Sequence, residues 1–384
     1  MKTYAVISAQ YFFYFSTLAV LVPFWGLFLQ DLGFAAFEIG ALLAIPTLTR
    51  LIAPNLWGWL ADHVHDAGRV ARLANWLAVA SFTPVFFARD FWLMALALSA
   101  FTFFWNATLP QMEAAALNHL APRYERYGYV RLWGSLGFVA LVFVLGPVVD
   151  AWGTGLVPGV TLGTLAATLL ASYFLRAPAA QRPPAVHGAF RQVLHRPGVI
   201  AFLGAAMLMQ FSHAPYYSFF SIYLEGLGYS KTATGLYWIF GTTCEVAVFL
   251  VMHRVLRRFD PLTVMIWCMA ASGLRWLLTA FVAADPLALA ATQSLHAVTF
   301  GAFHVSAMQI VHRLFTGRTQ FRGQAVYNSL AYGAGIALGS LASGYAWDPL
   351  GAQAVYVAAA VAALFAAAIT ARFVKPALAH RSGP

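Results

Sequence analysis

Charged side chains are scarce in this sequence. They make up 9% of its 384 residues, whereas a soluble globular chain carries about 25%. Hydrophobic residues account for 61% of the chain, and the mean hydropathy is +0.71. A soluble protein is therefore excluded, and the composition predicts a chain that crosses a membrane many times.

Cysteines and catalytic motifs are also few. The two cysteines, Cys244 and Cys268, lie in apolar segments, so no disulfide framework is indicated. The sequence has no Gly-Lys pair, which excludes a P-loop and an ATP-driven motor, and it has no G-x-S-x-G, H-E-x-x-H or paired-cysteine motif. We expect neither an enzyme nor a bound cofactor. The net charge of +10 would favour nucleic acid in a soluble protein, but here membrane topology accounts for it, and no nucleic-acid partner is expected.

Twelve hydrophobic segments are long enough to span a bilayer. Their approximate cores are residues 4–30, 37–61, 70–88, 91–119, 127–149, 154–175, 198–225, 232–256, 262–283, 286–313, 323–347 and 350–373. Arg89 and Lys231 lie in loops on one side, and all other loop Lys and Arg residues lie on the side that carries both termini. The positive-inside rule therefore predicts cytoplasmic termini, in a protein of the cell inner membrane.

The longest polar connection divides the chain into two halves. It covers residues 176–197 and is rich in Pro and Arg, and we interpret it as a cytoplasmic linker with a short surface helix. The predicted domains are an N-terminal six-helix bundle at 1–175 and a C-terminal six-helix bundle at 198–384.

The two halves repeat each other at an offset of 195 residues. Leu-Gly-Phe at 32–34 aligns with Leu-Gly-Tyr at 227–229, and the same offset places Arg50 on Glu245. A parallel duplication of six spans is one architecture of secondary transporters, in which the substrate site lies near the midplane between the halves. We therefore expect a central chamber between two bundles.

Two pairs of opposite charges lie inside the predicted spans. Pro122 is the midpoint between Glu113 and Arg131, so antiparallel helices joined there place both charges at one depth, about 10 Å below the turn. Glu245 and Arg275 flank a second turn in the same way. A charge inside a membrane helix costs roughly 2.5–3.5 kcal/mol, so each pair should face protein or water, and its two members should meet.

Each pair has two interpretations. It either only positions two helices, since buried ion pairs can serve specificity, or it forms a substrate or proton site, which is the default for ionisable groups inside a membrane. Arg50, about midway along the second span, adds a third arginine, so one positive charge is unmatched if both carboxylates are ionised. An anionic substrate held by two-pronged hydrogen bonds would supply the missing negative charge.

Three histidines, His213, His296 and His304, also lie within spans. Each is interpreted first as a core residue with satisfied hydrogen bonds. His296 and His304 are eight residues apart and share one helical face, which favours a polar stripe that faces a cavity. No carboxylate or thiol accompanies them at ligand spacing, so no metal site is predicted.

Aromatic residues crowd the first, fourth and seventh spans. Most must pack against other helices or face lipid. Some could form a wall beside a ring-bearing substrate, and the candidates are Tyr11, Trp105, Tyr216 and Tyr217.

Small residues recur in two other spans. Gly128, Gly134 and Gly137 lie in the fifth span, and the stretch GAGIALGSLASG at 333–344 lies in the eleventh. Small side chains let two helix backbones approach closely. The pattern predicts close helix crossings, either for static packing or for sliding during a conformational change.

One cytoplasmic motif is Gly58-Trp-Leu-Ala-Asp62, followed by Gly68-Arg69-Val-Ala-Arg72. It resembles the signature that major facilitator superfamily proteins carry between spans two and three. The spacing between the Asp and the Gly is longer than usual, and the corresponding stretch of the second half, HRVLRRFDP, lacks both residues. The resemblance implies the major facilitator fold and a role of Gly58, Asp62 and Arg69 in the cytoplasmic gate.

Further motifs are spread over most of the chain: YGYVRLWGS at 127–135, HAPYY at 213–217, SIY at 221–223, GLYW at 235–238 with Glu245, and FGAFH at 300–304. They resemble 3-phenylpropionate transporters, of the proton-symporter branch that includes lactose and nucleoside permeases. This resemblance implies uptake driven by protons through alternating access.

The resemblance also implies roles for the charged residues. By analogy with the sugar permeases of the branch, Glu113 and Arg131 would contact substrate. Four residues would serve proton coupling: Glu245, Arg275, His296 and His304. The carboxylate that lactose-type permeases carry on the tenth span is absent here, since residues 286–347 contain no Asp or Glu. Glu245 or Glu113 would then carry the proton, together with one of the two histidines.

We therefore predict an all-α, twelve-helix secondary transporter that imports a small organic anion, such as an aromatic monocarboxylate, together with a proton. Arg50 and Arg131 would hold the anion, and Glu245 would be the leading site of protonation. The alternative is a transporter of a neutral nucleoside or sugar in which Arg50 is only structural, and a channel or membrane receptor is a remote alternative. We expect a monomer. Saturable counterflow would identify a carrier, and ohmic conductance a channel.

Overall fold

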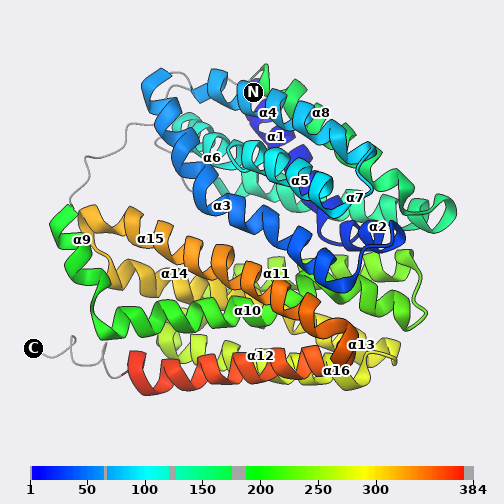
Figure 1. Cartoon of the computed structure of the whole chain (residues 1–384). Coiled ribbons are helices and arrows are strands. Elements are labelled where there is room, and N and C mark those ends of the chain that lie inside the picture. Colours follow the sequence, from blue (N-terminus) through cyan, green and yellow to red (C-terminus); the bar gives the residue numbers. More distant parts are fainter. Residues whose placement is uncertain (1, 65–66, 121–126, 175–186, 376–384) are drawn as a thin grey trace, which may run out of the picture. The chain divides into compact units, whose positions relative to one another are not determined.

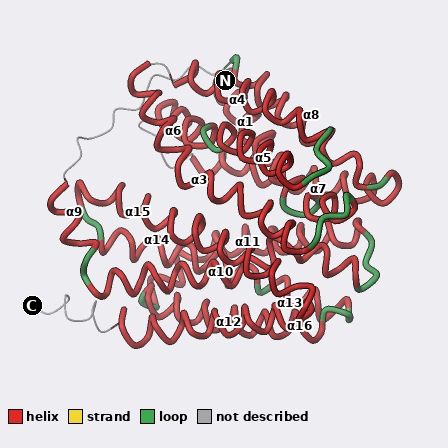
Figure 2. The backbone as a smooth tube through the Cα atoms, viewed as in Figure 1, coloured by secondary structure: helices red, strands yellow, loops and turns green. Residues whose placement is uncertain are grey.

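The computed structural model describes residues 2–64, 67–120, 127–174 and 187–375, and every regular element in this part of the chain is a helix (Figure 1 and Figure 2). The α-helices are α1 (Lys2–Leu21), α2 (Trp25–Asp31), α3 (Ala36–Val64), α4 (Ala67–Phe82), α5 (Phe91–Trp105), α6 (Thr108–Leu120), α7 (Tyr127–Trp152), α8 (Val157–Ser172), α9 (His187–Leu194), α10 (Pro197–Gly226), α11 (Lys231–Arg258), α12 (Pro261–Val282), α13 (Pro286–Ser294), α14 (Phe303–Leu314), α15 (Gln320–Asn328) and α16 (Ile336–Ile369).

Short segments of tighter or wider helix join these elements. Within the described ranges, three of them are 3₁₀ turns and three are π-helical, the latter with about one extra residue per turn. The 3₁₀ turns are η1 (Thr83–Phe86), η3 (Thr154–Leu156) and η5 (Gly317–Thr319). The π segments are η4 (Ala297–Ala302), η6 (Ser329–Gly335) and η7 (Thr370–Val374).

Nine helical runs in the described part of the chain are long and apolar enough to cross a membrane. The longest, Arg322–Val374, has 53 residues and is interrupted at Gly351, whose positive φ of 81° breaks the helix into two spans. The third and tenth predicted spans correspond to α4 with η1 and to α13, η4 and α14, which are interrupted helices. The prediction of an all-α membrane protein with these helical segments is confirmed.

The chain forms two compact units. Unit 1 contains Met1–Arg182 and Phe220–Leu236, and unit 2 contains Pro183–Phe219 and Tyr237–Pro384. Helices α10 and α11 therefore each belong in part to both units. The hairpin that joins these two helices, Phe220–Leu236, belongs to unit 1, whereas the predicted division places it in the second half. The six-plus-six division of the sequence therefore stays a prediction.

The predicted linker is described only in its second part. Residues 176–186 lie outside the described residues, and α9 follows them, where a short surface helix was expected. Its Phe190 ring stacks on Phe315, with centroids 5.9 Å apart, and the Arg322 guanidinium lies 5.2 Å from the Phe190 centroid. These contacts attach α9 to unit 2.

The aligned Leu-Gly motifs form the same turn. Gly33 and Gly228 have φ values of 87° and 86°, a conformation that suits glycine because it has no Cβ. The amide of Gly33 donates to the carbonyl of Gln30 at 2.9 Å, and that of Gly228 donates to Glu225 at 2.9 Å. Both bond partners keep the offset of 195 residues, so the predicted repeat holds at this turn.

Each unit contains a helix crossing that only glycine allows. A Cβ on Gly137 of α7 would lie 2.2 Å from the Phe12 carbonyl oxygen of α1, and one on Gly339 of α16 would lie 2.5 Å from the Phe211 carbonyl oxygen of α10. The predicted close approach is confirmed at these positions. Gly128 differs, because a Cβ there would meet nothing within 4 Å.

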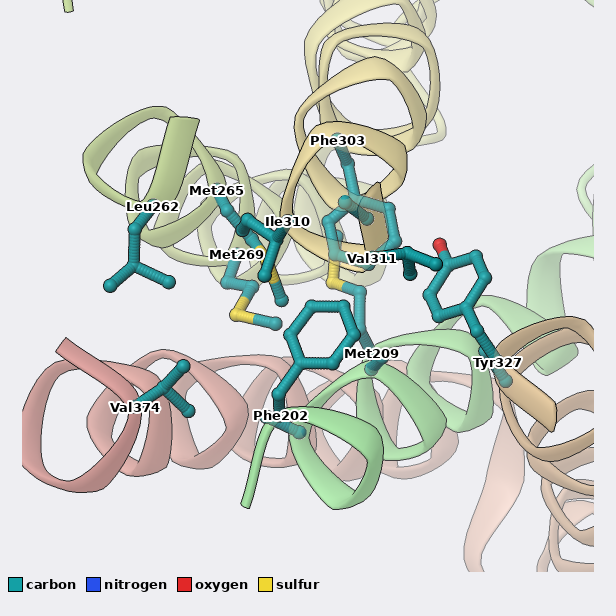
Figure 3. Packing of buried hydrophobic residues seen from close by; sticks show 14 of the residues in the cluster. Phe202, Met209, Leu262, Met265, Met269, Phe303, Ile310, Val311, Tyr327 and Val374 are labelled. Carbon is teal, nitrogen blue, oxygen red and sulfur yellow. The ribbon is translucent and has the colours of Figure 1, made fainter. Parts of the chain in front are cut away.

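The core of unit 2 combines small residues with long flexible and aromatic side chains (Figure 3). The large side chains come mainly from α10, α12, α14 and α15, and include Phe202, Met209, Met265, Met269, Phe303, Ile310 and Tyr327. Because lipid is as apolar as these side chains, dense van der Waals packing rather than water exclusion holds such helices together. The core fixes the helices that carry the charged residues of this unit.

Aspartates cap the helices that precede the site residues of unit 2. Asp260 accepts the amide of Leu262 at 2.9 Å at the start of α12, and Asp285 accepts the amide of Ala288 at 2.7 Å at the start of α13. Both caps are followed by proline, which suits the first helical position because its missing N–H would have no partner there.

Candidate functional site

The first charged cluster lies in unit 1, on α1, α6 and α7. Arg131 donates from Nη1 to Oε1 of Glu113 at 3.2 Å. The hydroxyl of Tyr127 donates to the same oxygen at 3.3 Å and lies 3.3 Å from the hydroxyl of Tyr11. The predicted meeting of Glu113 and Arg131 is confirmed, although the turn around Pro122 lies outside the described residues.

Aromatic rings line the α1 side of this cluster. Phe15 stacks on Tyr11, with centroids 6.3 Å apart, and the Arg131 guanidinium lies 5.6 Å from the Phe15 centroid. Tyr14 stacks on Trp105 of α5, with centroids 4.6 Å apart. Tyr11 thus contacts the charged cluster through its hydroxyl. Trp105 packs on Tyr14 instead.

Arg50 of α3 adds a second guanidinium to unit 1. Its side chain is exposed, and no carboxylate in the described residues pairs with it. Besides the pair of Arg131 and Glu113, unit 1 therefore contains a guanidinium that has no carboxylate partner among the described residues.

The ion pair of unit 1 is open to solvent. The side chain of Arg131 is 49% exposed and that of Glu113 is 39% exposed. Exposed ion pairs contribute only about 0–1 kcal/mol, because water competes for both partners. The pair can therefore exchange partners with an incoming ligand at low cost.

The second charged cluster lies in unit 2 around Arg275 of α12, which is fully buried. Its Nε donates to the carbonyl of Thr292 at 3.1 Å, and its Nη2 donates to Oε1 of Gln293 at 3.2 Å. Its Nη1 donates to the hydroxyl of Thr299 at 3.1 Å and lies 3.1 Å from Nδ1 of His296. All four partners come from one stretch of the tenth span and none is a carboxylate.

Two aromatic rings also contact this guanidinium. Its carbon lies 4.4 Å from the ring centroid of Tyr216 and 4.5 Å from that of Trp276. Such contacts contribute about 2 kcal/mol or more each when the cation is desolvated. The hydroxyl of Tyr216 donates to Oε1 of Gln293 at 3.1 Å, so tyrosine, glutamine and arginine form one network. Tyr216 is therefore a part of this cluster.

His296 lies between Arg275 and Glu245. Its Nε2 is 3.3 Å from Oε2 of Glu245, and its Nδ1 faces Arg275. The prediction that Glu245 and Arg275 meet directly is wrong, because the imidazole separates them. A Cβ added to Gly301 would lie only 3.2 Å from Cγ of Glu245. The absence of a side chain at Gly301 therefore lets η4 approach α11 closely enough for the contact of His296 with Glu245.

The tautomer of His296 follows from its neighbours. A guanidinium can only donate, so Nδ1 must accept the N–H of Arg275. The ring proton is then on Nε2 and is donated to Glu245. The cluster thus holds a neutral imidazole between a fixed cation and a carboxylate, and a second imidazole proton would have to displace Arg275.

His304 and His213 have different surroundings. His296 and His304 stack on Phe300, with centroid distances of 5.3 Å and 6.3 Å, which agrees with their predicted shared face. Nδ1 of His304 lies 2.9 Å from the hydroxyl of Tyr332. His213 is fully buried and its Nδ1 lies 2.9 Å from the carbonyl of Met209, as expected for a core histidine, whereas its Nε2 has no partner among the described residues.

The remaining predicted residues lie in two places. Tyr217 lies beside the second cluster, with its ring centroid 6.4 Å from that of Phe300. In the gate motif, Gly58 is buried in α3 and Arg69 is exposed in α4, while the side chain of Asp62 lies outside the described residues. Their role in a gate stays a prediction.

Three polar side chains that take part in the hydrogen bonds of the clusters were not predicted as site residues. Tyr127 lies four residues before Arg131, and Gln293 and Thr299 lie three residues on either side of His296. These spacings place each of them on the helical face of a predicted residue. Helical periodicity around each buried charge could have identified all three.

Two bacterial relatives align with almost the whole chain. A protein of Escherichia coli (strain K12) described as a probable 3-phenylpropionic acid transporter is 30% identical over 387 residues, which are 96% of this chain and 96% of the relative. A maltose permease of Geobacillus stearothermophilus is 27% identical over 355 residues, with 90% of this chain and 88% of the relative covered.

Solved structures share the fold. A nucleoside transporter, NupG, matches with a TM-score of 0.81 at 17% identity, covering 97% of this chain and 99% of its own. A bacterial homologue of the human lysosomal transporter Spinster matches with a TM-score of 0.80 at 12% identity, covering 100% of this chain and 98% of its own.

These comparisons confirm a multi-pass membrane transporter rather than an enzyme. The sequence model of the MFS_1 like family matches residues 4–358. Together with the helical fold and the charged clusters inside the spans, the match shows that the chain belongs to the MFS_1 like family of major facilitator transporters.

Proposed function

We propose that the protein is a proton-coupled symporter that imports a small organic anion by alternating access. An aromatic monocarboxylate is the first substrate to test, because the relative that is 30% identical is described as a probable 3-phenylpropionic acid transporter. The distribution of loop Lys and Arg supports cytoplasmic termini in the inner membrane.

The exposed guanidinium of Arg50 is the observation that carries this proposal. A buried or membrane-embedded charge requires a partner, and no described carboxylate pairs with Arg50. Glu113 is already bonded to Arg131, and Glu245 is bonded to His296. A substrate carboxylate would supply the absent negative charge.

The first cluster provides the chemistry for binding such an anion. Guanidinium groups bind carboxylates through two parallel hydrogen bonds. The weak, exposed pair of Arg131 and Glu113 can release Arg131 toward a second carboxylate. The rings of Tyr11 and Phe15 lie beside this guanidinium and offer an apolar face to an aromatic substrate.

The second cluster provides the chemistry for a proton. Glu245 is 17% exposed and accepts from an imidazole that cannot take a proton on Nδ1 while Arg275 occupies it. Glu245 is therefore the group of this cluster that can gain a proton without rearrangement. Arg275 acts as a positioning residue that holds His296 in the Nε2–H tautomer.

The charge balance sets the driving force. Symport of a monoanion with one proton moves no net charge, so only the pH gradient and the substrate gradient act. A second proton would add roughly 2.3 kcal/mol for each 100 mV of membrane potential. The dependence of uptake on voltage therefore reports the stoichiometry.

Three structural proposals accompany this function. The two halves, 1–175 and 198–384, would move about a shared chamber, and the protein would act as a monomer. Gly58, Asp62 and Arg69 would form the cytoplasmic gate, as their resemblance to the family signature implies.

A neutral nucleoside or sugar is the second candidate substrate. It is favoured by the 27% identity to a maltose permease and by the fold shared with a nucleoside transporter. In that case Arg50 would have only a structural role, and its replacement would leave substrate affinity unchanged.

Uptake into proteoliposomes tests the proposal. We expect the purified protein to accumulate labelled 3-phenylpropionate when the outside is made acidic, and to show saturable counterflow without a gradient. Maltose and a nucleoside should neither accumulate nor compete. Accumulation of a neutral compound, with no response to any carboxylate in a panel, would contradict an anion transporter.

A further inference from the structure

The carboxylate of Asp150, near the end of α7, binds the first turn of α11. Oδ1 accepts the backbone N–H of Lys231 at 2.8 Å, and Oδ2 accepts the backbone N–H of Thr232 at 2.8 Å. The hydroxyl of Thr232 donates to Oδ2 as well. Backbone N–H groups at a helix start have no partner within the helix and carry partial positive charge, so a carboxylate satisfies both needs.

The backbones of the two helices also meet closely at this place. A Cβ on Gly146, one turn before Asp150, would lie 3.0 Å from Cα of Thr232 and 3.2 Å from the carbonyl oxygen of Lys231. The Lys231 ammonium lies 2.5 Å from Oε1 of Glu225, which ties the start of α11 to the end of α10. The aspartate is therefore bound to a hairpin that is held together by its own ion pair.

This contact differs from the other aspartate caps of the chain. Asp90, Asp260 and Asp285 each cap the helix that they immediately precede. Asp150 instead caps a helix that begins 81 residues later in the sequence. A local cap stabilises the helix that directly follows it, whereas Asp150 connects the end of α7 to a helix that is distant in the sequence.

The attached segment belongs to helices that continue elsewhere. Phe220–Leu236 is a part of unit 1, while the remainder of α10 and α11 belongs to unit 2. The bonds of Asp150 are therefore contacts between this segment and the remainder of unit 1. The Asp150 side chain lies on the surface, where water can replace the lost bonds when the contact opens.

We propose that Asp150 and the first turn of α11 form a latch. The latch holds the Phe220–Leu236 hairpin against the end of α7 and opens once in each transport cycle. The proposal rests on the proposed alternating-access function and extends it to a specific contact. Arg89 and Lys231 place this end of the spans on the side opposite to the predicted cytoplasmic termini, so the latch lies at the outer ends of α7 and α11.

Distances between spin labels test the latch without any substrate. The native residues Cys244 and Cys268 are free thiols and are first replaced by serine. Labels are then placed at the exposed residues Trp152 and Leu227, and the protein is reconstituted in lipid nanodiscs. We expect Asp150→Asn to raise the ratio of long to short distances by about tenfold or more, since bonds to a charged group are lost.

Two control variants define the outcome. Thr232→Val removes one of three donors and should produce a smaller shift in the same direction. Asp90→Asn removes a local cap of the same chemistry and should leave the distances unchanged. Identical distances in Asp150→Asn and the parent, or an equal shift in Asp90→Asn, would overturn the latch.

A reversible crosslink tests whether opening is required. Asp150→Cys combined with Thr232→Cys, in the cysteine-free background, forms a disulfide in place of the latch. We expect the oxidised protein to lose uptake of 3-phenylpropionate and the reduced protein to regain it. Full uptake by the oxidised protein would show a permanent contact and overturn the proposal. Absence of uptake in both states and in the parent would refute the proposed function instead, and the label distances would then decide on the latch alone.

Discussion

The two charged clusters contain similar residues but differ in their access to water. In unit 1, Arg131 and Glu113 are 49% and 39% exposed and bind each other directly. In unit 2, Arg275 is fully buried, and the side chains of His296 and Glu245 are only 7% and 17% exposed. The first cluster can exchange its partners with a ligand, whereas the second is held rigidly by neutral acceptors and aromatic rings.

The difference in exposure suggests that the two clusters have different roles in transport. A charge in water loses little when its partner changes, while a buried network is costly to break because a desolvated charge is left without its partners. We therefore expect variants of the first cluster to affect substrate affinity, and variants of the second to affect coupling and stability. The predictions below are ordered by the size of the expected effect.

Replacing Glu245 should have the largest effect. Glu245→Gln keeps a hydrogen-bond acceptor beside His296 but cannot gain or lose a proton. We expect concentrative uptake driven by a pH gradient to fall to background, while counterflow, which needs no net proton movement, is retained. Substrate accumulation against a gradient by this variant would show that the proton is carried elsewhere. Glu38→Gln serves as the control, because the Glu38 carboxylate accepts the amide of Ala35 outside both clusters and outside the proposed latch.

Replacing an arginine by lysine should change the free energy of unfolding much more in the second cluster than in the first. Lysine keeps the charge but cannot reproduce the four directed bonds of Arg275, so Arg275→Lys should lower the free energy of unfolding by about 3–5 kcal/mol. Arg131→Lys, at an exposed pair, should change it by less than about 1 kcal/mol. Thermal unfolding in detergent measures both. Equal effects would mean that exposure does not distinguish the clusters.

Removing the charge of Arg50 should weaken anion binding. Arg50→Gln loses a charge-assisted hydrogen bond worth about 1.5–3 kcal/mol, which corresponds to a rise of KM by roughly 10–100-fold. Arg89→Gln, whose side chain bonds the neighbouring Ala88 carbonyl outside the clusters, is the matched control. An unchanged KM for 3-phenylpropionate in Arg50→Gln would favour a neutral substrate.

Removing a single hydroxyl in each cluster should give the smallest effects. Tyr216→Phe loses the bond to Gln293 and should cost about 1 kcal/mol of stability, because a buried acceptor loses one donor. Tyr11→Phe loses a long contact to another hydroxyl and should mainly change KM. Parallel measurement of thermal unfolding and uptake kinetics compares the two, and a larger loss of stability in Tyr11→Phe would reverse the expected order.

The sequence predicts the fold and one of the two clusters well. Long apolar segments define the spans, and the symmetric placement of Glu113 and Arg131 about Pro122 correctly predicts their contact. The same reasoning fails for Glu245 and Arg275, because level positions on two helices do not exclude a third side chain between them. His296 comes from another span, and its place depends on the close approach that Gly301 allows.

The bonds of Arg275 could not be predicted from charge alone. Its partners include a backbone carbonyl of Thr292, which no residue type identifies in a sequence. Gln293 and Thr299 are neutral, and neutral residues inside spans give a weaker signal than ionisable ones. Tertiary packing decides which of the many polar side chains of a span meets a buried guanidinium.

The ring of Phe300, stacked between the two histidines of the tenth span, has a further consequence. A benzene ring has no exchangeable hydrogen and offers no lone pair, so it cannot pass a proton from one imidazole to the other. His304 contacts the hydroxyl of Tyr332, and His296 contacts Glu245 and Arg275. The shared helical face of the two histidines therefore does not make them a direct proton relay.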